Sequence, residues 1–160
     1  MSQPSSSPIS ASASSSAAES VPVSAVPWAD PARQRLFTLW MASMAPVHGL
    51  LPDTLRIASA DASFRRYLRV DSVQGGSRIV MDAPPDKENS EPFVRIAALM
   101  KSAGLNAPEV LDWHQADGFM LLTDLGDATM MSAIDAERPQ ANQGLYMQAV
   151  DTLVQWQLAA

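Results

Sequence analysis

The chain has 160 residues, enough for one modest domain, and its hydrophobic content of 47% can supply a core. A net charge of −6, with no run rich in Lys or Arg, argues against nucleic acid or an anionic membrane surface as the main partner. The chain contains no cysteine and only two histidines, which excludes disulfides and Cys nucleophiles and argues against histidine-based metal sites. No apolar stretch reaches the length of a spanning helix, and the composition is compatible with a cytoplasmic protein.

The first 27 residues are rich in Ser, Ala and Pro and carry one charge, at Glu19. Such a tract has little to bury, so we expect it to be disordered. It has neither a basic start nor an apolar centre, and therefore does not resemble a signal peptide.

Order is expected to begin at Asp30 and Pro31, which suit the N-cap and the first position of a helix. An apolar stripe at helical spacing follows, and we expect the helix to end around Pro46 and Gly49. The stripe is made by Leu36, Phe37, Trp40, Met41 and Met44.

A β-hairpin is predicted next, with strands over 63–70 and 78–82 joined by a turn at 74–77. In the first strand, alternation puts Phe64, Leu68 and Val70 on one face and Arg65, Tyr67 and Arg69 on the other. The segment Ala83-Pro84-Pro85 should end the hairpin.

A helix over 91–103 is predicted to start near Asn89 or Ser90 and to stop at Gly104. Its buried face should consist of Phe93, Ile96, Ala97, Leu99 and Met100. Strands over 109–113 and 119–123 should follow, the second of them central because it is apolar almost throughout. A short helix over 129–134 and a longer one over 143–158 complete the prediction, the latter with Leu145, Ala149, Leu153 and Val154 on one side.

The order of elements predicts an α+β fold with a small antiparallel sheet and packed helices. Neither GxGxxG nor GxxxxGK[ST] occurs in the chain, so a dinucleotide fold and a P-loop are not expected.

Three segments carry a resemblance when taken in order: residues 60–67 (ADASFRRY), 79–85 (IVMDAPP) and 119–126 (FMLLTDLG). Together they resemble the amino-terminal lobe of the aminoglycoside phosphotransferase and choline kinase superfamily. Within it, the bacterial kinases that phosphorylate N-acetylmuramate or N-acetylglucosamine, enzymes of peptidoglycan recycling, are the most similar. The resemblance implies a nucleotide-binding lobe over 28–126 and the start of a helical substrate lobe over 127–160.

The resemblance also implies nucleotide-binding residues. Small residues at the entry of a strand could bring backbone N–H groups to phosphate oxygens, although a plain polar turn explains them as well. These residues are Ala60, Asp61, Ala62 and Ser63. The segment Thr123-Asp124-Leu125 would be the hinge whose backbone bonds the adenine edge. Met120 and Leu122 could line the adenine pocket or simply pack in the core.

Arg66 stands on the apolar face of its strand and needs an anionic partner. The partner could be a nucleotide phosphate, or a carboxylate such as Asp82 on the neighbouring strand. The superfamily's phosphate-binding lysine falls on Met81 or Asp82, so another cation, Arg66 first, would have to act in its place. Glu88 or Glu91 could stand for the glutamate that pairs with this lysine, or could simply favour a helix start.

The catalytic aspartate and the Mg²⁺ ligands of the superfamily find no match after Gly126, and the last predicted helix has no stop signal. We therefore expect a fragment that uses ATP and Mg²⁺ only with a further lobe, and an exposed apolar face on the last helix. An aminoglycoside or choline-type kinase is the nearest alternative. A nonenzymatic nucleotide-binding or interaction module is the alternative of a different class.

Overall fold

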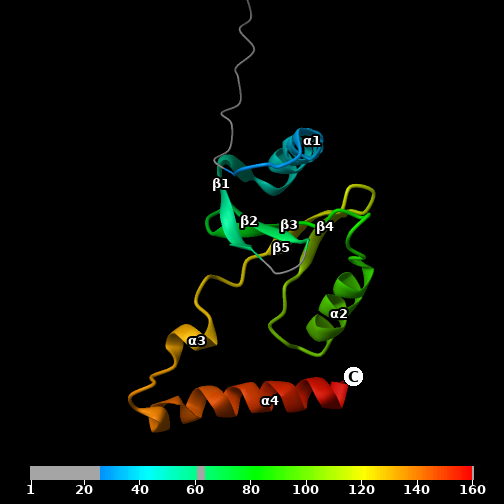
Figure 1. Ribbon diagram of the computed structural model, residues 1–160. Coiled ribbons are helices and arrows are strands. Elements are labelled where there is room, and N and C mark those ends of the chain that lie inside the picture. Colours follow the sequence, from blue (N-terminus) through cyan, green and yellow to red (C-terminus); the bar gives the residue numbers. More distant parts are fainter. Residues whose placement is uncertain (1–25, 61–63, 160) are drawn as a thin grey trace, which may run out of the picture.

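The computed structural model describes residues 26–60 and 64–159, which form one five-stranded antiparallel sheet with helices around it (Figure 1). The strand order is β1-β2-β3-β5-β4, which confirms the predicted α+β fold. The strands are β1 (Leu50–Ala60), β2 (Arg66–Ser72), β3 (Ser77–Asp82), β4 (Val110–His114) and β5 (Phe119–Thr123). The helices are α1 (Pro31–His48), α2 (Glu91–Ser102), α3 (Met130–Ala133), the 3-10 helix η1 (Pro139–Asn142) and α4 (Gln143–Ala159).

Helix α1 begins and ends where its capping residues predict. The Asp30 carboxylate accepts a hydrogen bond from the Ala32 N–H at 2.8 Å, and Gly49 ends the helix with a φ of 61°. The prediction that Pro46 ends the helix is wrong, because Pro46 lies inside the last turn. Helix α1 covers one face of the sheet with Phe37, Trp40 and Met41, which belong to the same buried cluster as alternate residues of β2, β3 and β5.

Strand β1 was not predicted, and it forms the edge of the sheet beside β2. Its pairing with β2 shifts register between Leu51 and Arg56 and again between Ile57 and Ser59. Each such irregularity resets which side chains point to the core, so no alternation of polar and apolar residues marks this strand in the sequence.

The β2–β3 hairpin and β5 form the centre of the sheet as predicted. Leu68 pairs with Val80, which pairs with Leu121, and all three are buried. The strand β2 begins at Arg66 rather than at residue 63, and Phe64 precedes it with 66% of its surface exposed. The placement of Phe64 on the buried face is therefore wrong.

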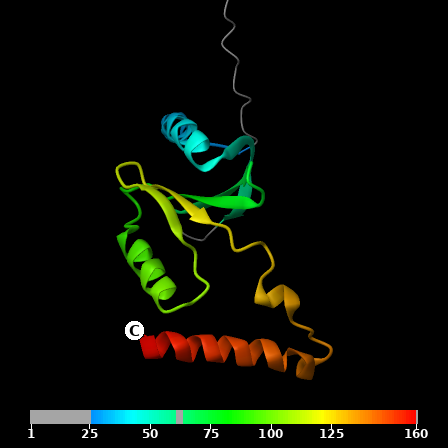
Figure 2. The same cartoon turned by 180° about the vertical axis from the view of Figure 1, so that it is seen from behind.

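The helices on the other side of the sheet are packed less tightly (Figure 2). In α2 only Ala97 is buried, and the prediction is wrong for Ile96 and Leu99, which are exposed because α2 contacts β4 along a narrow stripe. Helix α4 has no buried residue, and its predicted apolar side, with Leu153 and Val154, is exposed. No helix in the described residues is long and apolar enough to cross a membrane.

Candidate functional site

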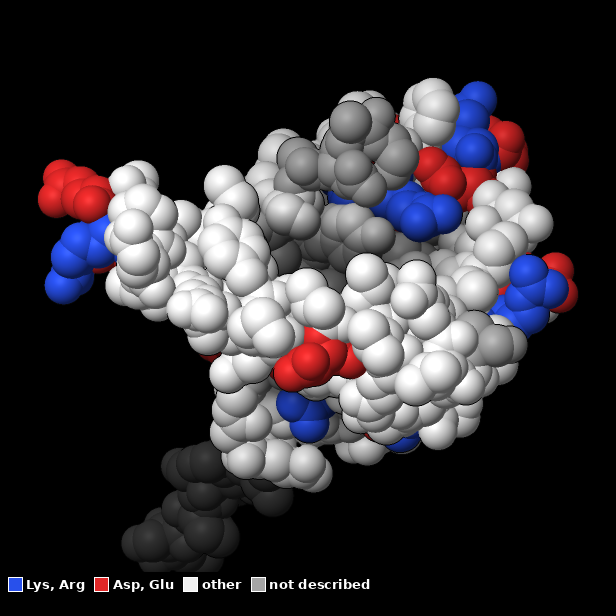
Figure 3. Space-filling view, turned by 90° about the horizontal axis from the view of Figure 1, so that it is seen from below, with Lys and Arg blue, Asp and Glu red and all other residues white. Residues whose placement is uncertain are grey.

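A groove of about 510 Å³ lies on the face of the sheet opposite α1. Tyr67, Ile79 and Leu122 form its floor, and Phe93 of α2 closes one side. The segment after β5 forms the opposite wall. In the view from below, a hollow is visible between the arm that carries α3 and α4 and the sheet (Figure 3).

The predicted hinge residues Thr123, Asp124 and Leu125 all line this groove. The Thr123 N–H donates to the Glu109 carbonyl at 3.0 Å, and the Thr123 hydroxyl accepts from the Glu109 N–H at 2.9 Å. These two hydrogen bonds hold the hinge against Glu109, the residue before β4. Among the described residues no hydrogen bond from the N–H of Leu125 is formed.

An ion pair between strand β2 and the hinge was not predicted. Arg69 donates two hydrogen bonds to Asp124, from Nε to Oδ2 at 2.6 Å and from Nη2 to Oδ1 at 3.0 Å. Ser77 Oγ and the Gly126 N–H also donate to this carboxylate, at 2.6 and 2.8 Å. These bonds, those from Arg69 first, lower the pKa of Asp124 to about 2, against the effect of burial. The same pairing raises the pKa of Arg69.

The sequence indicated the face of the strand on which Arg69 lies but not its partner. Alternation put Arg69 on the face opposite Leu68, and no partner for it was predicted. The partner follows 55 residues later, and only the β2–β3–β5 register brings the two together.

Arg66 and Asp82 lie on the α1 face of the sheet and do not line the groove. Arg66 donates to Asp82 Oδ2 from Nη2 at 2.6 Å, and Arg33 of α1 donates to Oδ1 at 2.7 Å. Of the two partners considered for Arg66, the structure thus shows the carboxylate of Asp82. The two guanidinium groups also lie over aromatic rings, Arg66 over Trp28 and Arg33 over Phe119. A role of Arg66 or Asp82 in nucleotide binding stays a prediction.

A further cation, Arg65, directly precedes β2 and pairs with a residue of the β3–α2 connection. Arg65 Nη2 lies 3.2 Å from Glu88 Oε2, and Glu88 Oε1 accepts from the Phe64 N–H at 3.3 Å. Alternation places Arg65 on the same face as Tyr67 and Arg69.

Strand β3 carries an apolar side chain where a lysine is usual. Met81 is fully buried with Met120 on the groove side of the sheet, while Asp82 points to α1. Leu122 lines the groove, whereas Met120 packs in the core. The groove side of β3 therefore offers no cation to a phosphate.

The small-residue loop is described only at its start. Ala58 and Ser59 of β1 line the groove, and Ala60 ends β1. Asp61, Ala62 and Ser63 lie outside the described residues, so their predicted contact with phosphate stays a prediction. Among the described residues no three His, Asp or Glu side chains converge as metal ligands, so we assign no Mg²⁺ ligand in this chain.

The five-stranded antiparallel sheet with α2 between β3 and β4, and the groove at the end of β5, agree with the amino-terminal lobe of a kinase. Residues 54–160 match the model of the phosphotransferase enzyme family. The chain belongs to this family.

Three curated relatives all carry the name N-acetylmuramate/N-acetylglucosamine kinase. The relative from Pseudomonas aeruginosa is 39% identical over 132 residues, which are 81% of this chain and 36% of the relative. That from Pseudomonas putida is 42% identical over 104 residues, 65% of this chain and 30% of the relative. That from Neisseria meningitidis is 35% identical over 129 residues, 80% of this chain and 37% of the relative. The chain thus spans about a third of the length of the curated relatives it matches.

Proposed function

We propose that this chain is the nucleotide-binding part of an ATP-dependent kinase that phosphorylates a hydroxyl group of N-acetylmuramate or N-acetylglucosamine. The observation that carries the proposal is the groove at the end of β5, which combines an apolar floor with open hinge backbone. The family supports phosphotransfer, and the names of the relatives support the sugar.

The adenine would lie on the apolar floor of the groove, against Leu122 and Ile79. An adenine edge presents donors and acceptors side by side, and hinge backbone can match both. The free N–H of Leu125 is the donor that we assign to it.

The triphosphate needs a cation, and the described residues that line the groove include one, Arg69. Its Nε and Nη2 atoms donate to Asp124, and Nη2 also donates to the Gly126 carbonyl at 3.0 Å. We therefore assign the phosphate contact to Arg65, whose guanidinium pairs with Glu88 in the segment before α2. An Arg–Glu pair can act as the usual Lys–Glu pair does, since guanidinium groups bind phosphate oxygens with two parallel hydrogen bonds.

In the reaction, the γ-phosphoryl group passes from ATP to the sugar oxygen, the bond to the bridging oxygen breaks and ADP leaves. Mg²⁺, when bound with ATP, would neutralise charge on the phosphate oxygens. The part that we assign to this chain is to hold adenine at the hinge and the phosphates at Arg65. The base that takes the hydroxyl proton is not assigned to any described residue.

The test is a phosphotransfer assay on the complete translation product of the gene that contains this sequence. With ATP, we expect N-acetylmuramate or N-acetylglucosamine to be phosphorylated and choline and kanamycin to be left unchanged. Turnover of choline or kanamycin instead would refute the substrate, and absence of any ATP-dependent product would refute the activity.

A further inference from the structure

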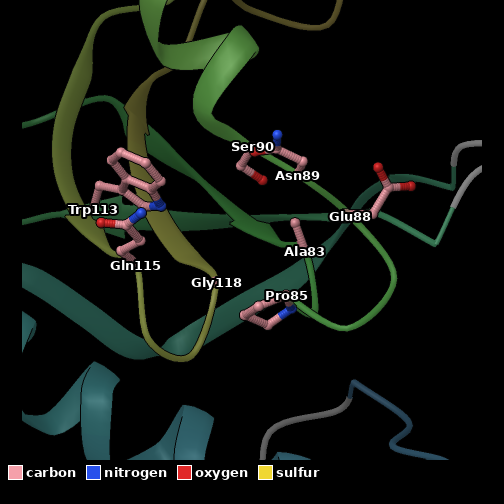
Figure 4. A pocket seen from close by; sticks show the side chains of 8 residues that line it. All are labelled: Ala83, Pro85, Glu88, Asn89, Ser90, Trp113, Gln115 and Gly118. Atoms are coloured by element: carbon pink, nitrogen blue, oxygen red, sulfur yellow. The ribbon is translucent and has the colours of Figure 1, made fainter.

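A second pocket, of about 170 Å³, lies at the other end of β5 from the hinge (Figure 4). Its lining comes from the β3–α2 connection, the start of α2 and the β4–β5 turn. It shares no lining residue with the groove, although Glu88 of this pocket pairs with Arg65, to which the phosphate contact is assigned.

Two buried polar atoms of this pocket have no hydrogen-bond partner among the described residues: Ser90 Oγ and Trp113 Nε1. Only 6% of the surface of Ser90 is exposed. Ser90 is the N-cap of α2 but makes no capping bond with its side chain, because Asn89 Oδ1 accepts from the Glu91 N–H in its place, at 3.0 Å. In Figure 4 the Trp113 ring lies across the pocket from Ser90.

A glycine at the end of the β4–β5 turn allows this turn to contact the β3–α2 connection closely. Gly118 has a φ of 69°, and its carbonyl accepts from the Ala83 N–H at 2.9 Å. A Cβ at this position would lie 1.9 Å from the Ala83 carbonyl oxygen. The two backbone segments therefore lie in close contact, and position 118 does not accommodate a side chain.

The unpaired polar groups of this pocket favour a ligand that both donates and accepts hydrogen bonds. The Trp113 indole N–H can only donate, so it needs an acceptor. The Glu88 carboxylate also lines the pocket; it accepts from the Phe64 N–H and pairs with Arg65, and its remaining lone pairs can accept a hydrogen bond from a ligand. An anion would satisfy Trp113 but would face Glu88, whereas a cation would leave Trp113 unpaired. A hydroxyl group satisfies both, and Ser90 can pair with it in either sense.

We propose that this pocket binds a small neutral polyhydroxy molecule of the size of one monosaccharide or less. The volume supports this size, because a cavity of about 150 Å³ accepts a six-membered ring such as benzene. The amide side chains of Asn89 and Gln115 at the rim add groups that bond hydroxyls in either sense. The proposal does not depend on the nucleotide site, since binding here is measured without ATP.

The experiment titrates the ¹⁵N-labelled 160-residue chain with glucose and, separately, with glycerol. The four tryptophans give four indole N–H signals, and the variant Trp113→Phe identifies that of Trp113. We expect glucose or glycerol to shift the Trp113 signal and to leave that of Trp40, which lies on the other side of the sheet, in place.

The matched variants are Ser90→Ala and Ser102→Ala, at the two ends of α2. Ser90→Ala should weaken binding of the shifting ligand about ten-fold, as expected for loss of one buried hydrogen bond. Ser102, whose hydroxyl bonds the Leu99 carbonyl at 2.8 Å on the exposed side, should have no effect. Ser90 makes no capping bond, so α2 should persist in Ser90→Ala, and far-UV circular dichroism checks this.

Four results would overturn the proposal. In the first, neither glucose nor glycerol shifts the Trp113 signal. In the second, the shift is the same in Ser90→Ala as in the wild type. In the third, acetate or phosphate shifts the signal and the neutral probes do not. Displacement of a bound probe by an ATP analogue would place the probe in the groove and would also overturn it.

Discussion

The ion pair between Arg69 and Asp124 ties strand β2 to the hinge, and Asp124→Asn should show its contribution to stability. The Asp124 side chain is 6% exposed and that of Arg69 is 16% exposed. A pKa lowered from 3.8 to about 2 corresponds to about 2 kcal/mol of native-state stability at neutral pH. Removal of the charge also leaves the largely buried Arg69 without a carboxylate partner. We therefore expect Asp124→Asn to lower the free energy of unfolding by about 2 to 3 kcal/mol.

The assay is urea unfolding at pH 7, followed by circular dichroism. The matched control is Asp71→Asn, which removes an exposed pair with Arg56, with side chains 39% and 47% exposed. This control should cost less than about 1 kcal/mol. If Asp124→Asn costs no more than Asp71→Asn, the hinge pair does not stabilise the fold and the reasoning fails.

The pH dependence gives a second check on the same group. The folded-state pKa of Asp124 lies below the ordinary value, so its contribution is complete above about pH 4 and is lost as the pH falls towards 2. The difference in unfolding free energy between wild type and Asp124→Asn should therefore shrink over this interval. A difference that stays constant down to pH 2 would contradict the assigned pKa.

Three further changes test the fold. Asp82→Asn should lower the free energy of unfolding by about 3 kcal/mol or more, because it leaves two arginines on the α1 face without their carboxylate; urea unfolding measures this. Gly118→Ala should destabilise the chain far more than Gly76→Ala in thermal unfolding. Both glycines have a positive φ, but only the first would place a Cβ against the Ala83 carbonyl. Asp30→Ala should cost about 1 kcal/mol through loss of the cap of α1, and an unchanged melting temperature would contradict that role.

Features that depend on neighbouring residues could be predicted from the sequence. Asp30 and Gly49 mark the ends of α1, the turn before Ser77 joins the hairpin, and the apolar run of β5 identifies it as an interior strand. The hinge residues of the candidate site follow directly on β5, so a correct β5 also places them in the groove.

Features that depend on strand register could not be predicted. The irregular pairing of β1 removes the alternation by which a strand is recognised. The partners of Asp82 include Arg33, which is 49 residues away on a different element. For the same reason the sequence could name a phosphate and Asp82 as candidate partners of Arg66 but could not decide between them, or show that Arg65 pairs with Glu88.

Nucleotide affinity tests the central proposal most directly. We suggest calorimetric titration of the chain and of Arg65→Gln and Arg66→Gln with a nonhydrolysable ATP analogue. Each variant removes one guanidinium group, and the two positions are adjacent in the chain, so the variants form a matched pair. The proposed site predicts affinity about ten-fold weaker or more for Arg65→Gln, through loss of a charged hydrogen bond, and little change for Arg66→Gln. Weaker binding in Arg66→Gln alone, or no binding by the wild-type chain, would contradict it.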